Sequence, residues 1–231
     1  MKRFATALLA GVALLAISSE SFAGPNANAK IALHLLTPTT KTPCTRIQTT
    51  PACQNIVTSG NLYPQLYFAH VLVTDGNEPA GVAGLQFGIQ YTGPGAADGV
   101  GIDIYAWTNC ATLEFQSPAP AWPNSGAGNL VTWDAGTRCQ RTEPGGAGTG
   151  VVANAGYFYC AAYTPGTFCI TPRPVDGVAK VADCAAQEDI VTGTPSHLGC
   201  LGFGGQPGYN PCGLITPVEN TTWSAIKSNL R

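Results

Sequence analysis

Charged side chains are scarce in this chain. Only 10% of its 231 residues are Asp, Glu, Lys or Arg, and the formal net charge at pH 7 is −2. A chain with so few charges lacks the basic surface that electrostatic binding to nucleic acid requires. It also lacks the charge density of a solvated disordered tail or of a coiled coil. The composition therefore excludes a nucleic-acid partner and indicates one globular domain.

Long apolar runs are absent after residue 23, so the sequence predicts no internal membrane span, which takes about 20 apolar residues as a helix. Before that point a basic start precedes an apolar stretch at 7–17, and Ser21 and Ala23 supply the small residues that a signal peptidase reads. We interpret residues 1–23 as a signal peptide cleaved before Gly24. The alternative, a membrane anchor, is disfavoured because the apolar stretch is short. The protein is then secreted to the medium, the cell surface or the periplasm.

Motifs for catalysis and metal binding are also missing. There is no GxSxG elbow, no HExxH and no phosphate-binding loop framed by a strand and a helix. No CxxC pair and no calcium-binding DxDxDG run occurs. Carboxylates do lie close together in three places: Asp75 and Glu78, Asp98 and Asp103, and Asp183, Glu188 and Asp189. We interpret them as turn and cap residues. A glycosidase would need two carboxylates facing each other across a cleft. We expect no catalytic residue, no metal and no cofactor.

Cysteine, in contrast, is abundant. All nine cysteines follow residue 23, and in an exported protein they predict disulfides. Nine is odd, so at least one sulfur stays outside an intramolecular pair. Spacing does not fix connectivity, but short turn-like loops favour some pairs. The expected pairs are Cys44–Cys53, Cys110–Cys139 and Cys184–Cys212, and a fourth would join two of Cys160, Cys169 and Cys200, with Cys160–Cys169 preferred.

Apolar and polar residues alternate with a period of two along most of the chain after residue 23. In 82–91, Leu85, Phe87 and Ile89 fall on one face, and Gln86 and Gln90 fall on the other. The expected strands are 29–36, 65–74, 82–91, 99–107, 129–134, 151–163, 167–174 and a short one within 177–183. Strands do not alternate with helices, which disfavours Rossmann and TIM folds. The sequence predicts an all-β antiparallel sandwich over residues 24–191.

The rest of the chain is less regular. Residues 192–217 are rich in Gly, Pro and Ser, and we expect either an extension that a disulfide holds on the sandwich or a mobile linker. A short helical turn is expected within 181–191. A C-terminal helix is expected within 218–231, because Thr221 or Thr222 can cap an apolar stripe. The stripe consists of Trp223, Ile226 and Leu230. It would dock on the same chain or on a neighbouring molecule.

One of the four tryptophans stands apart from the strand patterns. Trp107 and Trp133 fall inside expected strands and are expected in the core, whereas Trp122 lies on a loop between prolines at 117–126. An aromatic ring held by stiff flanks can stack on a sugar or on a partner protein. Trp122 is therefore the candidate ligand-binding residue. The alternative is that it folds back over the edge of the sandwich.

Three segments resemble cohesin-like and related immunoglobulin-like modules of secreted bacterial proteins. They are VAGLQFGIQYTGPG (82–95), CATLEFQSPAP (110–120) and NLVTWD (129–134). The resemblance implies a nine-stranded, jelly-roll-like sandwich that binds a partner domain through one sheet face. The chain also resembles uncharacterised secreted proteins of environmental bacteria, on RPVDGVAKVADC (173–184) and TTW-x-x-IK (221–227). That second resemblance implies no activity.

Two functions fit these observations. The first is a secreted, non-enzymatic sandwich module for protein binding or for assembly outside the cell, since export, disulfides and strands occur without a catalytic motif. The second is a secreted carbohydrate-binding or carbohydrate-active protein, suggested by Trp122 and by the aromatic strand at 157–163. A protein or a polysaccharide is therefore the expected partner, and the sequence favours a role other than catalysis.

Overall fold

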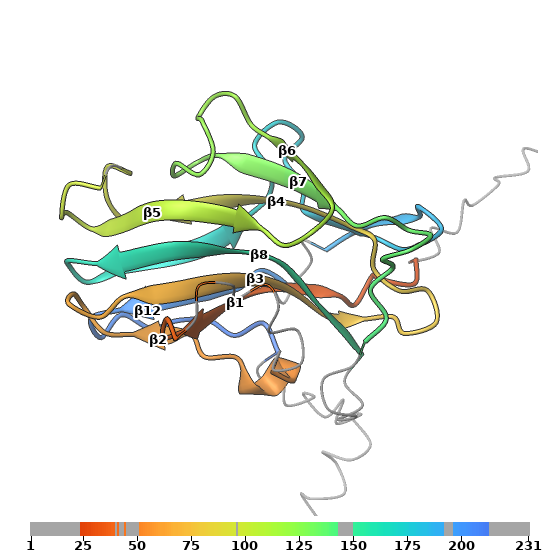
Figure 1. Ribbon diagram of the computed structural model, residues 1–231, viewed down its shortest axis with the longest axis horizontal. Coiled ribbons are helices and arrows are strands. Elements are labelled where there is room, and N and C mark those ends of the chain that lie inside the picture. Colours follow the sequence, from red (N-terminus) through yellow and green to blue (C-terminus); the bar gives the residue numbers. More distant parts are fainter. Residues whose placement is uncertain are drawn as a thin grey trace, which may run out of the picture.

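Two β-sheets pack face to face in the computed structural model, which describes residues 24–39, 41, 44, 51–95, 97–142, 150–191 and 196–212 (Figure 1). The first sheet has the strand order β1-β3-β8-β5, and every pair in it is antiparallel. Its strands are β1 (Lys30–Leu36), β3 (Tyr67–Gly76), β8 (Val151–Ala162) and β5 (Ile102–Asn109). This sheet faces the viewer in Figure 1, with β5 uppermost.

The second sheet lies behind the first and is branched. Its main path is β11-β10-β4-β9-β12-β2, while β7 also pairs with β4 and β6 pairs with β7. The bounds are β2 (Ser59–Gly60), β4 (Gly84–Tyr91), β6 (Leu113–Gln116), β7 (Gly128–Thr132), β9 (Gly166–Thr171), β10 (Lys180–Ala182), β11 (Glu188–Ile190) and β12 (Cys200–Phe203). A short 3-10 helix, η2, spans Cys53–Asn55. The chain is thus an all-β sandwich, as the sequence predicts.

The alternation in β4 places its side chains as expected. Leu85, Phe87 and Ile89 are buried in the core between the two sheets. Gln90 is exposed on the opposite face. Gln86 shares that outer face and is also buried, but under the turn at 173–178, where its Nε2 donates to Asp176 Oδ2 at 2.7 Å. The burial of Gln86 therefore comes from a covering turn and not from the core.

All eight expected strands are present, as β1, β3, β4, β5, β7, β8, β9 and β10. The helical turn expected within 181–191 is wrong, because β10 and β11 form an antiparallel hairpin there, with Val181 opposite Asp189. Asp183 closes the turn of the hairpin, since its Oδ1 accepts the N–H groups of Ala185 and Gln187, each at 2.8 Å. Val181 is fully buried, which a strand facing the core explains.

The stretch expected as an extension contributes β12 to the second sheet. Leu201 and Phe203 are fully buried there, and β12 pairs with β9 on one side and with β2 on the other. These two large side chains are enough to hold β12 in the sheet because the neighbouring strands supply the remaining contacts. The expected helix at 221–231 lies outside the described residues. Within the described ranges, no helix is both long and apolar enough to cross a membrane.

Four disulfides connect segments that are far apart in the sequence, and one of the four joins two neighbouring strands, β9 and β12. They are Cys44–Cys110, Cys53–Cys212, Cys139–Cys184 and Cys169–Cys200, and Cys160 is free and buried. The expected pairs Cys44–Cys53, Cys110–Cys139, Cys184–Cys212 and Cys160–Cys169 are therefore wrong.

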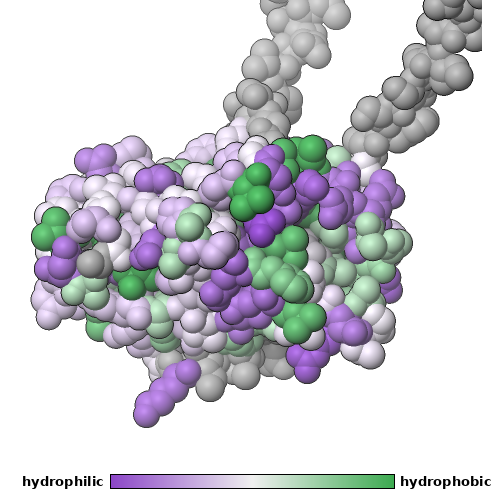
Figure 2. All heavy atoms as spheres, turned by 90° about the horizontal axis from the view of Figure 1, so that it is seen from above, coloured by the Kyte–Doolittle hydropathy of each residue, from purple (hydrophilic) through white to green (hydrophobic). Residues whose placement is uncertain are grey.

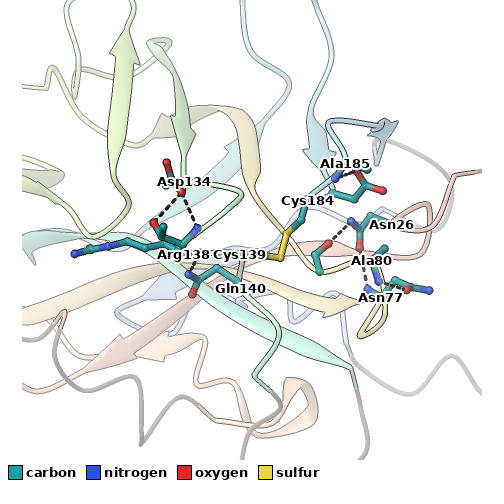
Figure 3. Close-up of a disulfide and its surroundings, with 12 residues drawn as sticks. Asn26, Asn77, Ala80, Asp134, Arg138, Cys139, Gln140, Cys184 and Ala185 are labelled. Carbon is teal, nitrogen blue, oxygen red and sulfur yellow. Dashed lines mark hydrogen bonds between the residues drawn. A yellow bond between two sulfur atoms is a disulfide. The ribbon is translucent and has the colours of Figure 1, made fainter.

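The order of the strands explains the observed pairs. Cys169 and Cys200 are direct partners in the register of β9 and β12. Cys139 and Cys184 flank the entry to β4 from opposite sides (Figure 3): Gln140 exchanges main-chain hydrogen bonds with Val82, and the Cys184 N–H donates to Ala80 O. Proximity along the chain is thus a poor guide to pairing in this fold.

Candidate binding surfaces

Trp122 packs into the core instead of standing out from its loop. It is 9% exposed, and its ring centroid lies 5.5 Å from that of Phe87, 5.2 Å from that of Trp107 and 5.5 Å from that of Phe158. A large aromatic ring gains more from burial than from exposure. The ligand-binding role expected of Trp122 is corrected accordingly: it offers no free ring face, and it closes the edge of the sandwich.

The paired carboxylates serve turns and an ion pair. Asp98 Oδ1 accepts the Val100 N–H at 3.0 Å, and Asp103 Oδ2 accepts the Gly99 N–H at 3.0 Å. Asp75 pairs with Lys30, which joins the end of β3 to the start of β1. These are the contacts of turn carboxylates rather than those of a glycosidase pair.

Among the residues that the structure describes, one group has the spacing of metal ligands: the ligand atoms of Cys53, Asp75 and Cys212 lie within 4.8 Å of one another. Cys53 and Cys212 form a disulfide, so neither sulfur is available as a thiolate. Asp75 is already engaged by Lys30. The donor set therefore does not fit a metal ion.

The two strand histidines are structural. His34 and His70 are register partners on β1 and β3, and both are buried. His34 Nδ1 accepts the Val57 N–H at 2.9 Å, which requires an unprotonated nitrogen. Burial, and to a lesser extent the neighbouring His70, lower the pKa of His34 to about 4. The imidazole thus anchors the chain beside β1 rather than exchanging protons near neutral pH.

Exposed apolar side chains stand at both ends of a row of register partners that crosses the outer face of the second sheet. Direct register partners run from Phe115 on β6 through Leu130, Gln86 and Lys180 to Ile190 on β11. The row spans five strands, so its ends lie about 19 Å apart at the usual strand spacing. Phe115 is 56% exposed and Ile190 59%. Leu113, 57% exposed, shares the face with Phe115; we call Leu113, Phe115, Leu130 and Ile190 the apolar face.

A hollow lies within this face because two of its positions carry little or no side chain. Gly84 on β4 and Ala182 on β10 are register partners, and a hollow of about 130 Å³ opens beside them. Its lining consists of Gly84, Leu85, Gln86, Leu130, Thr132, Lys180, Ala182 and Glu188. Lys180 and Glu188 form an ion pair of 2.7 Å across the hairpin. The side of the molecule that carries β6 and β7 shows hydrophobic residues gathered next to hydrophilic ones (Figure 2).

Tyrosines gather on the outer face of the first sheet. The rings of Tyr63 and Tyr163 stack at 4.8 Å with planes 16° apart, and the hydroxyls of Tyr105 and Tyr163 are 2.8 Å apart. Tyr159 adds a ring 5.5 Å from that of Tyr105. Tyr63 is 54% exposed and Tyr105 36%. We call Tyr63, Tyr105, Tyr159 and Tyr163 the tyrosine cluster.

The opposite end of this outer face is covered. Ile56 packs there against Ala32, Leu72 and Val152, beneath the segment that the Cys53–Cys212 disulfide holds down. The tyrosine cluster therefore occupies the end of the sheet away from this covering segment.

The sequence indicated part of the tyrosine cluster but not the apolar face. The strand at 157–163 contains Tyr159 and Tyr163, but their partners Tyr63 and Tyr105 come from elsewhere in the chain. Leu113 and Phe115 alternate with Glu114 and Gln116, a strand signal that is short because β6 has only four residues. No alternation could have indicated that its apolar side faces solvent.

Comparison with known proteins gives a weak structural likeness and no likeness in sequence. No sequence family matches the chain, and no curated protein is similar to it in sequence. Among solved structures, the chain is similar in outline to a cohesin module from a family 33 glycoside hydrolase of Clostridium perfringens ATCC13124. The two chains are 7% identical with a TM-score of 0.42, and the match covers 76% of this chain and 97% of the cohesin module.

Proposed function

We propose that this protein is an exported, non-enzymatic β-sandwich module that binds a partner protein through the apolar face. The observation that carries the proposal is the exposure of three large apolar side chains, Leu113, Phe115 and Ile190, on one face of the second sheet. Leu113 and Phe115 lie two residues apart on the same face of β6, and exposed apolar surface of this kind is typical of interaction sites. The four disulfides are in keeping with export, because such bonds persist in oxidising compartments.

The face also has features that would orient a partner. The hollow beside Gly84 and Ala182 can accept an apolar side chain of the partner, since its walls include the side chains of Leu130 and Ala182. The Lys180–Glu188 ion pair borders it with one charge of each sign. Binding would then depend on apolar burial at the centre and on polar contacts at the rim. Because the chain is weakly charged, affinity should change little with ionic strength.

The experiment compares partner capture by three immobilised proteins: the wild type, Leu113→Ser with Phe115→Ser, and Tyr209→Ser. Tyr209 is 41% exposed and pairs with Cys200 on β12, away from the apolar face, so its variant is the matched control. Extracellular proteins from the producing organism are the probe. A partner retained by the wild type and by Tyr209→Ser, but lost with the double variant, supports the proposal. Equal retention by all three overturns it.

A second function, carbohydrate binding, is favoured by the tyrosine cluster. Exposed tyrosine rings can stack on the apolar faces of sugars while their hydroxyls form hydrogen bonds. The stacked pair Tyr63 and Tyr163 and the linked hydroxyls of Tyr105 and Tyr163 supply both features. Retention on insoluble polysaccharides that Tyr63→Ala and Tyr105→Ala weaken, while Leu113→Ser with Phe115→Ser leaves it unchanged, would support this function over the first.

A further inference from the structure

The first described residues of the chain lie beside a buried carboxylate. Asp189 on β11 is only 5% exposed, and its Oδ2 accepts the main-chain N–H of Asn26 at 2.8 Å. Gly24 lies against the same carboxylate, so closely that a β carbon on Gly24 would lie 2.6 Å from Oδ2 and would also overlap Oδ1. Only glycine fits at this position without displacing Asp189.

The segment that carries Gly24 is fixed on both sides. Asn26 is fully buried; its Nδ2 donates to Gly81 O at 2.9 Å, and its Oδ1 accepts the Asn77 N–H at 2.8 Å. Figure 3 shows Asn26 between the turn at Asn77 and the Cys139–Cys184 disulfide. The Ala27 N–H donates to Gly24 O at 3.1 Å. Gly24 is thus held in place next to Asp189.

Asp189 has no cationic partner within the described part of the chain. The ion pairs found there are Lys30–Asp75, Arg173–Asp176 and Lys180–Glu188. A carboxylate buried to this extent is costly unless a positive charge or several hydrogen bonds compensate it. The Asn26 N–H supplies one such bond. A missing positive charge is therefore the feature that needs an explanation.

We infer that cleavage of the Ala23–Gly24 peptide bond supplies this charge, as the α-ammonium group of Gly24 paired with Asp189. Hydrolysis places the oxygen of water on the new carboxyl group of Ala23 and leaves an amine on Gly24, which takes up a proton at neutral pH. The Gly24 nitrogen lies about 2.5 Å from the β position by covalent geometry, hence within about 5 Å of Asp189 Oδ2. A small rotation brings the two groups into an ion pair.

The pair would link the two sheets. Gly24 and Asn26 lead into β1 of the first sheet, and Asp189 belongs to β11, the end strand of the second. In the uncleaved precursor the Gly24 nitrogen is an uncharged amide, so the ion pair is absent and, among the described residues, only the Asn26–Asp189 hydrogen bond joins the two segments. The folded state is thus stabilised by maturation, and the export precursor is the less stable form. The inference depends on the expected cleavage before Gly24 and is independent of what the module binds.

The test is a double-mutant cycle between the amino group and the carboxylate, using oxidised protein. Chains beginning at Gly24 are compared with chains carrying a Gly-Ser extension before Gly24, each with Asp189 and with Asp189→Asn. When Asp189 is present, we expect the extension to lower Tm by about 3 °C or more. In the Asp189→Asn protein, we expect the extension to change Tm by less than about 1 °C. Additive effects, or equal Tm values for the free and extended chains, overturn the inference.

Asp183→Asn is the matched control. Asp183 is also 5% exposed and lies in the same hairpin, but it binds the turn and not the N-terminal segment. Its effect on Tm should be the same with and without the extension. Mass spectrometry of the exported protein tests the cleavage separately, and a mature N-terminus other than Gly24 overturns the inference whatever the Tm values are.

Discussion

Phe115 and Ile190 stand at opposite ends of one row of register partners that crosses five strands of the second sheet. The first lies on β6 and the second on β11, and more than half of each side chain is exposed. Strands that face water on one side normally carry polar residues there. The two large apolar side chains that end this row are the observation on which the proposed partner-binding surface rests.

Phe87 should be among the most sensitive positions of the core. It is fully buried and contacts Trp107 and Trp122. Phe87→Ala leaves a cavity and should lower the free energy of unfolding by roughly 3–5 kcal/mol. Denaturant unfolding at pH 7 measures the change, with the exposed Phe115→Ala as a control that should cost far less. Similar losses for the two variants would contradict the arrangement of the core.

Trp122 should affect stability and not ligand binding. Because its ring packs on Phe87, Trp107 and Phe158, Trp122→Ala should destabilise the fold by roughly 3–5 kcal/mol. Tyr63→Ala should cost less, since Tyr63 is 54% exposed. Thermal unfolding and polysaccharide retention are measured on the same samples. A folded Trp122→Ala protein of unchanged Tm that has lost retention would show that the ring binds ligand after all.

The free thiol should be unreactive in the folded protein. Cys160 is buried on β8, and burial raises its pKa to about 12. A thiol reagent should therefore label no cysteine in the native, non-reduced protein and one cysteine after denaturation. Peptide mapping should identify that cysteine as Cys160. More than one labelled cysteine in the denatured, non-reduced protein would contradict the four disulfides.

His34 should make the fold sensitive to acid. Its pKa is about 4 in the folded protein, below the ordinary value near 6.5, so the unfolded chain binds more protons between these values. The stability that His34 contributes is complete above pH 6.5 and is lost as the pH falls through 4. By pH 4.5 the loss is on the order of 2–3 kcal/mol.

Denaturant unfolding at pH 7 and pH 4.5 tests this expectation. His34→Asn keeps an acceptor for the Val57 N–H but does not titrate. The variant should lose less stability between the two pH values than the wild type does. An equal loss in both proteins would show that other groups cause the acid sensitivity.

The strands were predictable because alternation reflects a physical need. A strand with one face in the core must place apolar side chains at every second residue, as Leu85, Phe87 and Ile89 do in β4. The strands that were missed are short. In β12 only Leu201 and Phe203 are large apolar side chains buried in the core, too few to form a clear alternating pattern. In β6 the alternation places Leu113 and Phe115 in solvent, which the local sequence does not reveal.

The disulfide pairs and the position of Trp122 could not be predicted from the sequence, and the reason differs from that for the short strands. Both depend on which strands become neighbours. Cys139 and Cys184 meet because their segments flank the entry to β4, although 45 residues separate them. Trp122 is buried because Phe87, Trp107 and Phe158, from three strands, form a pocket for its ring. Neither fact is contained in the residues close by in the chain.

Site-specific photo-crosslinking tests the central claim, that the apolar face is covered by a protein, most directly. A photoreactive phenylalanine analogue is placed at Phe115 or, as the control, at Tyr209 on the far side of the second sheet. The exported proteins are irradiated in the culture of the producing organism. The account predicts a discrete crosslinked species from position 115 that is absent from position 209 and that Ile190→Ser weakens. No crosslink at position 115, or the same species from both positions, would contradict it.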